Sequence, residues 1–135
     1  SIKVVEVAGD GPAFCSGGDL DEFGTTPDPG TAHLVRLRQN VGLALHRVAE
    51  RVAVRLHGAC IGAGIELAAF AGSVSAADDT YVQLPELAMG LIPGAGGTVS
   101  LPRRIGRWRT FYLALLGSPV PVNELAGWGL VDHRA

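Results

Sequence analysis

The sequence predicts an α/β domain with a largely parallel sheet. Runs rich in β-branched residues alternate with runs of helical periodicity, and glycine- and proline-rich turns separate the two kinds of run. Because strands and helices alternate along the chain, parallel pairing through helical crossovers is favoured. The length of 135 residues suits one domain with a sizeable core.

The N-terminal part is expected to contain a strand, a long loop and a helix. Residues 2–9, IKVVEVAG, form a short β-rich run, and the residues after them are expected to be loop up to Leu20. Asp28 and Pro29 are typical of a helix N-cap and a first helical residue. Apolar residues at steps of three and four then predict a helical stripe, made of Leu34, Leu37, Val41, Leu45 and Val48.

The middle of the chain is expected to supply strands and a central helix. RVAVRL, residues 51–56, alternates valine and leucine with arginine and alanine, as a half-buried strand does. HGACIGAGIELAAF, residues 57–70, predicts a strand, a glycine turn and a helix from about Gly64. SVSAADDTYVQL, residues 73–84, predicts two short strands separated by an Asp-Asp turn and ended by Pro85.

The C-terminal part is expected to be loop and helix. Residues 91–106, LIPGAGGTVSLPRRIG, are punctuated by glycine and proline and predict a loop with about one helical turn. A helix is predicted over residues 107–116, stopped by Gly117 and Pro119. A last short helix is expected after an Asn123 cap.

Composition and charge argue against several classes of partner. Eleven basic and thirteen acidic residues give a net charge of −2, without a basic stripe suited to nucleic acid. Four arginines between residues 103 and 109 are interpreted as a solvated helix face. Cys15 and Cys60 lack metal-site spacing and are expected to be reduced thiols of a cytoplasmic protein. No metal site is expected from their spacing. The apolar stretch 57–77 contains Glu66 and four glycines, so we expect no membrane span.

Motifs for nucleotide binding and for hydrolysis are weakly matched. Gly62 and Gly64 begin a G-x-G-x-x-G pattern, but Leu67 replaces its third glycine, and no acidic residue ends a strand about twenty residues later. GLIPGAGGT, residues 90–98, lacks the lysine of a P-loop. Ser16 lies outside a G-x-S-x-G elbow, and none of the histidines stands at a diagnostic spacing.

Two glutamates stand in unusual surroundings. Glu66 lies just inside a predicted helix start, where unpaired N–H groups favour an anion. Glu86 follows Pro85 among apolar neighbours, where desolvation favours the protonated acid. Two carboxyl groups with separated pKa values could serve as a base and an acid. From spacing alone, a helix-start charge at Glu66 and a surface carboxylate at Glu86 explain the pattern equally well.

Four segments together resemble one family. AFCSGGDLDEF, HGACIGAGIELAAFAG, LPELAMGLIPGAGGTVSLPRRIG and AGWGLVD have the order and spacing of the enoyl-CoA hydratase/isomerase, or crotonase, superfamily. The resemblance covers Val4 to Asp132 and implies a crotonase-like (ClpP/crotonase) α/β spiral of ββα units. It also implies homotrimers or dimers of trimers that act on acyl-CoA thioesters. Because family members are longer, residues 1–135 are expected to form a single partial core domain, incomplete at both ends.

The resemblance assigns roles to individual residues. Backbone N–H groups of Gly18 and Ala63 would form an oxyanion hole for the thioester oxygen, and Glu66 and Glu86 would be the two catalytic carboxyl groups of a hydratase. No cofactor beyond the CoA moiety of the substrate is implied. The backbone of one loop would contact CoA, through Gly18, Asp19, Leu20 and Asp21.

Departures from the family pattern leave the reaction open. Alanine stands at position 63, where most relatives have glycine, and Val82 and Leu84 replace smaller or polar neighbours of Glu86. Having both glutamates favours hydration of a 2-enoyl-CoA to a 3-hydroxyacyl-CoA. The alternatives are a Δ3,Δ2-enoyl-CoA isomerase or another crotonase-type enzyme that uses one carboxylate, and a catalytically inactive acyl-CoA-binding or scaffold subunit.

Overall fold

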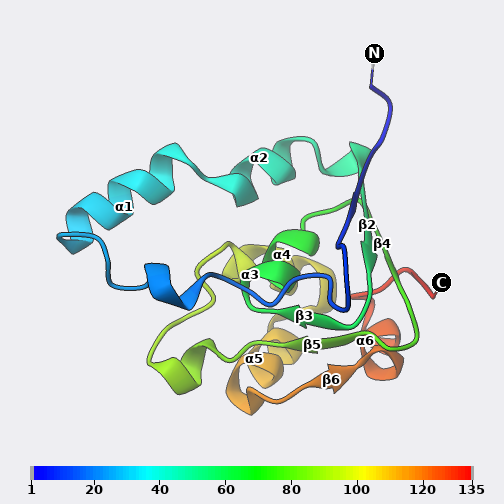
Figure 1. Ribbon diagram of the computed structural model, residues 1–135. Coiled ribbons are helices and arrows are strands. Elements are labelled where there is room, and N and C mark those ends of the chain that lie inside the picture. Colours follow the sequence, from blue (N-terminus) through cyan, green and yellow to red (C-terminus); the bar gives the residue numbers. More distant parts are fainter. Residues whose placement is uncertain (1, 135) are drawn as a thin grey trace.

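Two small sheets with helices around them make up the protein, a computed structural model in which residues 2–134 are described (Figure 1). The first sheet is parallel throughout, with the strand order β1-β2-β4-β7. The second has the order β3-β5-β6, in which the β5–β6 pair is antiparallel. The strand bounds are β1 Val5–Ala8, β2 Val52–Leu56, β3 Ala59–Ile61, β4 Ser73–Ala76, β5 Tyr81–Gln83, β6 Val120–Pro121 and β7 His133–Arg134.

Helices cover these sheets and supply much of the core. Short 3-10 helices lie between a strand and a helix at Leu20–Glu22, Ala49–Arg51 and Glu86–Met89, and are labelled η1, η2 and η3. The helix bounds are α1 Pro29–Arg38, α2 Val41–Arg47, α3 Ala63–Ala68, α4 Gly97–Ile105, α5 Arg107–Leu116 and α6 Val122–Trp128.

The strand predictions for residues 51–84 are confirmed. In β2 the valines and Leu56 are buried while Arg55 is exposed, as the alternating pattern requires. The two strands on either side of the Asp-Asp turn are β4 and β5, but they belong to different sheets. The turn itself is tied to the link between β2 and β3, because Asp79 accepts a hydrogen bond from the N–H of Gly58 (3.1 Å). The chain thus passes from one sheet to the other at this point.

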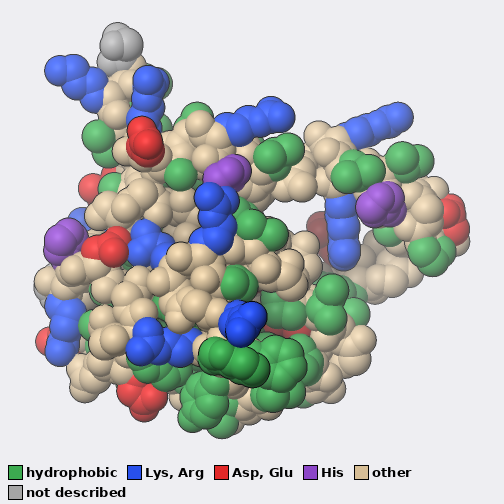
Figure 2. Space-filling view, turned by 180° about the vertical axis from the view of Figure 1, so that it is seen from behind, with side chains coloured by type: hydrophobic (Ala, Val, Ile, Leu, Met, Phe, Trp, Pro, Cys, Tyr) green, Lys and Arg blue, Asp and Glu red, His purple; other side chains and the backbone are tan. Residues whose placement is uncertain are grey.

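The helical stripe predicted after Asp28 differs from the structure in two ways. Asp28 does cap α1, accepting from the N–H of Thr31 (2.9 Å), but the helix ends at Arg38 and a new one begins after Asn40. Asn40 caps α2 by accepting from the N–H of Leu43 (2.7 Å). The apolar residues of α1 are also exposed instead of facing the core, and this helix stands away from the sheets (Figures 1 and 2).

The loop predicted over residues 91–106 is wrong in its second half, which is the helix α4. Ser100, Leu101 and Ile105 of α4 are buried, and the helix packs against α3. This packing stabilises a helix that local propensity disfavours, since Pro102 lies inside it and two glycines precede it. The last helix begins at Val122 with Pro121 as its N-cap, so the prediction of Asn123 as the cap is wrong by two residues.

The helix predicted over residues 107–116 is confirmed as α5, which ends at Gly117. Figure 2 shows apolar side chains gathered over this part of the surface, where Trp108, Phe111 and Leu115 are exposed. An exposed apolar patch is typical of an interaction surface. The homotrimer implied by the resemblance stays a prediction.

The central helix α3 is held at its C-terminal end by an arginine. Arg104 donates hydrogen bonds to the carbonyl oxygens of Ala69 (3.2 Å) and Ala71 (2.6 Å), and it forms an ion pair with Asp132 (3.1 Å). Its side chain is only 13% exposed, so the prediction of a solvated arginine face is wrong for this residue. These bonds fix the end of α3 to the C-terminal segment and leave its N-terminal end facing the pocket described next.

Candidate active site

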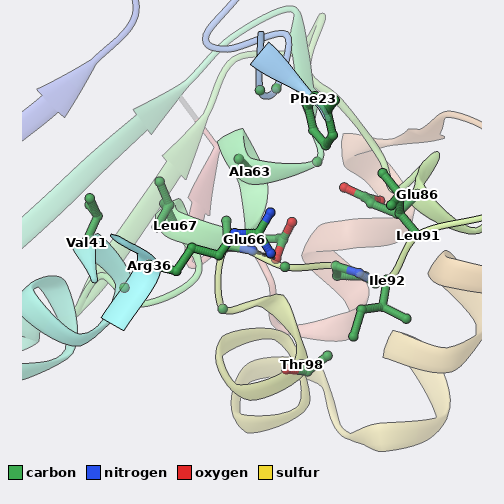
Figure 3. A pocket seen from close by; sticks show the side chains of 18 of the residues that line it. Phe23, Arg36, Val41, Ala63, Glu66, Leu67, Glu86, Leu91, Ile92 and Thr98 are labelled. Carbon is green, nitrogen blue, oxygen red and sulfur yellow. Dashed lines mark hydrogen bonds between the residues drawn. The ribbon is translucent and has the colours of Figure 1, made fainter. Parts of the chain in front are cut away.

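A pocket of about 670 Å³ lies between α1–α2 on one side and the start of α3, η3 and residues 91–96 on the other (Figure 3). The structure brings together in its lining Gly18, Ala63, Glu66 and Glu86, which the sequence assigned to one site. Leu20 also lines it, whereas Asp19 and Asp21 of the same loop lie outside the lining. The walls are otherwise mostly apolar side chains and backbone.

The turn from β3 into α3 presents one backbone donor to the pocket. Gly62 has a φ of +51°, a conformation that favours glycine, and its N–H donates to the carbonyl oxygen of Gln83 (2.9 Å). A Cβ on Gly62 would come within 2.6 Å of Oε1 of Glu86, so the Glu86 carboxyl group lies directly against this turn. The next N–H, that of Ala63, has no acceptor among residues 2–134.

A second backbone donor comes from the loop that follows Cys15. The Cys15 N–H donates to the carbonyl oxygen of Ala59 (3.1 Å), and the Ile61 N–H donates to that of Cys15 (2.9 Å). This pairing carries the chain alongside β3, so Gly18 reaches the same pocket as Ala63. The sequence predicted only loop here. The N–H of Gly18 also has no acceptor in the described part of the chain.

Glu66 is buried and held by backbone donors. Its side chain is 1% exposed, and its Oε2 accepts hydrogen bonds from the N–H groups of Ala95 (2.8 Å) and Gly97 (2.7 Å). Burial raises the pKa of Glu66 above its ordinary value, and the nearby Glu86 raises it further, while the two N–H groups oppose the change. The expected preference of the helix start for a charged Glu66 is therefore outweighed by desolvation.

The first residue of α4, Gly97, has no room for a side chain beside Glu66. A Cβ on Gly97 would lie 2.5 Å from Cγ of Glu66 and 2.8 Å from its Oε2. The glycines that looked like a poor phosphate-binding motif therefore position a carboxyl group. Sequence reasoning missed the partners Ala95 and Gly97, because they are about thirty residues from Glu66 and only the packing of α4 on α3 brings them close.

Glu86 is the second buried carboxyl group and the first residue of η3. It is 8% exposed, and its Oε2 has no hydrogen-bond partner among the described residues. Burial raises the pKa of Glu86, and its bonds to its own backbone and to Glu66 oppose the change. This direction agrees with the expectation that desolvation favours the protonated acid. Figure 3 shows Glu86 and Glu66 entering the pocket from different elements.

His57 and Cys60 take no part in this pocket. His57 bonds to the carbonyl oxygen of Gly11 through Nε2 (3.0 Å), a structural contact. Burial raises the pKa of Cys60 to about 12, which leaves its thiol protonated and unreactive. Within residues 2–134, no cluster of three or more His, Cys, Asp or Glu side chains could hold a metal ion. Over the same residues, no helix has the length and hydropathy needed to cross a membrane.

Comparison with known proteins gives consistent matches over nearly the whole chain. The family model described as enoyl-CoA hydratase/isomerase matches residues 1–134. Mevalonyl-coenzyme A hydratase SIDH of Beauveria bassiana (strain ARSEF 2860) is 32% identical over 98% of this chain and 50% of its own length. The crystal structure of enoyl-CoA hydratase from Thermoplasma volcanium GSS1 is 33% identical, with a TM-score of 0.89 over 98% of this chain and 54% of that one.

A further solved structure, from Thermobifida fusca YX, is in complex with CoA. It is 29% identical to this chain, with a TM-score of 0.84, and the match covers 98% of this chain and 55% of that one. The chain therefore spans about half the length of the relatives it matches.

Proposed function

Because the chain belongs to the enoyl-CoA hydratase/isomerase family, we propose that it hydrates a 2-enoyl-CoA to the 3-hydroxyacyl-CoA. The crotonase-like α/β fold predicted from the sequence is confirmed by the structural matches. One observation supports the reaction: Glu66 and Glu86 are both buried in a pocket that is also lined by two backbone N–H groups without an acceptor among residues 2–134.

The N–H groups of Gly18 and Ala63 would accept the charge that develops on the thioester oxygen. When water adds to the β-carbon, the electrons of the double bond move through the α-carbon to this oxygen and form an enolate. Donors that are already oriented stabilise such an oxyanion without further reorganisation. Both donors belong to the backbone and are free of protein acceptors among residues 2–134, as this role requires.

Glu66 would be the base that activates the water. Its Oε2 is occupied by the N–H groups of Ala95 and Gly97, which leaves Oε1 to accept the proton of a water molecule. As the water oxygen bonds to the β-carbon, Glu66 takes this proton. A pKa raised by burial makes the carboxylate a stronger base.

Glu86 would supply the second proton. Burial raises the pKa of both carboxyl groups, and the proposal places the retained proton on Glu86, whose Oε2 has no partner among the described residues. Transfer of this proton to the α-carbon collapses the enolate to the thioester and completes the addition of water. A proton that passes from Glu66 to Glu86 then restores the starting state. An isomerase needs one such carboxyl group, so the pair favours the hydratase.

The CoA moiety would lie along the loop that begins at Gly18. Gly18 and Leu20 line the pocket, and Asp19 braces the loop by accepting a hydrogen bond from the N–H of Asp21 (3.0 Å). The related structure from Thermobifida fusca YX contains CoA, which supports this ligand class. The proposed contacts are made by the backbone and do not depend on the charges of Asp19 and Asp21.

Substituting each glutamate by glutamine tests the proposal. Glu66→Gln should lower the rate of crotonyl-CoA hydration by about 10²–10⁴-fold, while Glu86 still exchanges the α-proton of a saturated acyl-CoA with deuterated solvent. Glu86→Gln should lose both activities. Glu124→Gln, an exposed residue of α6, is the matched control and should retain both.

Three results would contradict this assignment. Normal hydration by Glu66→Gln would point to a single-carboxylate reaction such as isomerisation. Retention of both activities by Glu86→Gln would remove its proposed role. Absence of any turnover in a chain that binds crotonyl-CoA would favour the scaffold alternative.

A further inference from the structure

Helix α1 places a cation in the wall of the pocket. His33 and Arg36 lie three residues apart, on one face of the helix, and both line the pocket. Nη1 of Arg36 is 3.7 Å from the position that a Cβ on Gly94 would occupy. Its guanidinium group therefore reaches the loop whose next residue, Ala95, binds Glu66. Figure 3 shows the Arg36 side chain extending from α1 toward this part of the site.

No protein carboxylate neutralises Arg36 within residues 2–134. The ion pairs there join Arg55 to Glu6, Arg104 to Asp132 and Arg134 to Asp78. Glu66 is occupied by two backbone N–H groups instead of the guanidinium. A guanidinium group presents a planar fork of donors that matches a carboxylate in two parallel hydrogen bonds. The charge of Arg36 is thus available to an anionic group of a ligand.

The position of Arg36 in the pocket indicates which ligand group it would meet. Glu66, Leu67, Val41 and Arg36 all line this pocket. With the thioester oxygen at Gly18 and Ala63, an acyl chain that passes Glu66 would continue toward α1. Figure 3 shows the apolar side chains of Val41 and Leu67 on the same side as Arg36. Methylene groups would pack against these two residues, and a charged end would reach the guanidinium. The CoA phosphates are separated from the thioester by the pantetheine arm, so they fit this position less well.

We infer, on the basis of the proposed function, that the acyl group ends in a carboxylate that Arg36 binds. The substrates would then be mono-CoA thioesters of unsaturated dicarboxylic acids. Arg36 determines specificity in this proposal, and the proton transfers remain with the two glutamates. His33, one turn earlier on the same face, adds a second polar group beside the carboxylate.

Equilibrium binding tests this inference independently of turnover. Calorimetry would compare glutaryl-CoA, its ω-methyl ester and free CoA, because the ester keeps the length of the chain and removes its charge. The wild-type chain should bind glutaryl-CoA about tenfold or more tightly than the ester. Arg36→Met should reduce this preference to less than about twofold, and Arg36→Lys, which keeps the charge but not the fork, should retain part of it.

Arg38→Met is the matched control, because Arg38 lies on the same helix but outside the pocket lining. It should retain the wild-type preference. Equal binding of the acid and the ester by the wild type would overturn the inference. Equal weakening of glutaryl-CoA, the ester and free CoA in Arg36→Met would also overturn it, and would assign Arg36 to the CoA phosphates.

The inference and the proposed function can fail separately. Hydration of crotonyl-CoA by a chain without preference for the carboxylate would leave the hydratase and reject the role of Arg36. The opposite outcome is a chain that lacks hydratase activity but prefers the carboxylate, with a preference that Arg36→Met abolishes. This result would support the binding role of Arg36 and reject the proposed reaction. Absence of binding of any CoA thioester would reject both.

Discussion

The two walls of the pocket differ in how firmly they are packed. On one side, Glu66 and its neighbour Ile65 are fully buried, α3 packs on α4, and two backbone hydrogen bonds hold the carboxyl group. On the other side, α1 has no buried residue, and α2 has one, Gly42, with Leu45 partly buried against the core. The proposed chemistry is on the packed wall, and the proposed choice of acyl group is on the open wall.

A pocket with one packed wall and one open wall can combine precise positioning with tolerance of different ligands. Proton transfer requires groups held within a fraction of an ångström, which only a packed core provides. Recognition of the far end of an acyl chain tolerates more movement of the protein groups. Long side chains on an exposed helix are therefore sufficient for this recognition. We therefore expect substitutions on the packed wall to alter stability and turnover, and substitutions on the open wall to alter selectivity alone.

The largest expected difference between the walls is in stability. Leu101 of α4 is 0% exposed, whereas Leu37 of α1 is 58% exposed. Leu101→Ala should lower the free energy of unfolding by about 2–5 kcal/mol, because it leaves a cavity in the core. Leu37→Ala should change it by less than about 0.5 kcal/mol. Urea unfolding followed by circular dichroism measures both, and a similar loss in the two variants would show that α1 is packed as firmly as α4.

A smaller effect is expected from moving Glu66 without removing it. Gly97→Ala forces a Cβ to within 2.5 Å of Cγ of Glu66, so the carboxyl group must shift. A displacement of this kind should lower kcat for hydration by about 10²-fold. Gly127→Ala is the matched control, since a Cβ there meets nothing within 4 Å. Unchanged kcat in Gly97→Ala would mean that the exact position of Glu66 does not limit the reaction.

The smallest expected effect is a change in the pH dependence of stability. Burial raises the pKa of Glu86 in the folded state, so between its ordinary value of 4.5 and the raised value the unfolded chain loses this proton first. The folded state then binds more protons than the unfolded state, and stability falls as the pH rises. The free energy of unfolding of Glu86→Gln, minus that of the wild type, should therefore increase as the pH rises from 4.5 toward neutrality.

The control for this measurement is Glu124→Gln, whose side chain is exposed on α6. A gain for Glu86→Gln that shrinks as the pH rises would show that the folded state favours the charged form of Glu86.

The sequence predicted features that depend on neighbouring residues. Alternation of apolar and other residues predicted β2, the glycines predicted the turn before α3, and Gly117 predicted the end of α5. All three are confirmed. The resemblance added the grouping of Gly18, Ala63, Glu66 and Glu86, which the pocket brings together.

Features that depend on distant residues could not be predicted from the sequence. The helix α4 forms against its local propensity because α3 packs on it, and the bonds of Glu66 span about thirty residues. The side chain of Arg36 was overlooked for a related reason. Apolar periodicity predicted the stripe of α1, but only the arrangement in space shows that this helix faces a pocket instead of the core.

The parallel β-bridge between the backbones of Cys15 and Cys60 bears on how new reactions could arise on this chain. Each proposed oxyanion donor lies three residues beyond one of these paired cysteines, on neighbouring parallel segments. Strands in such a pair lie about 4.8 Å apart. The backbone ladder thus sets how closely the two donor-bearing segments run, provided that the glycines between them are kept, because a Cβ on Gly64 would lie 2.7 Å from Cβ of Cys15. Substitution of the glutamates or of residues in α1 would leave the two backbone donors in place to stabilise an enolate. The substrate and the reaction could therefore change in evolution while the oxyanion hole is kept.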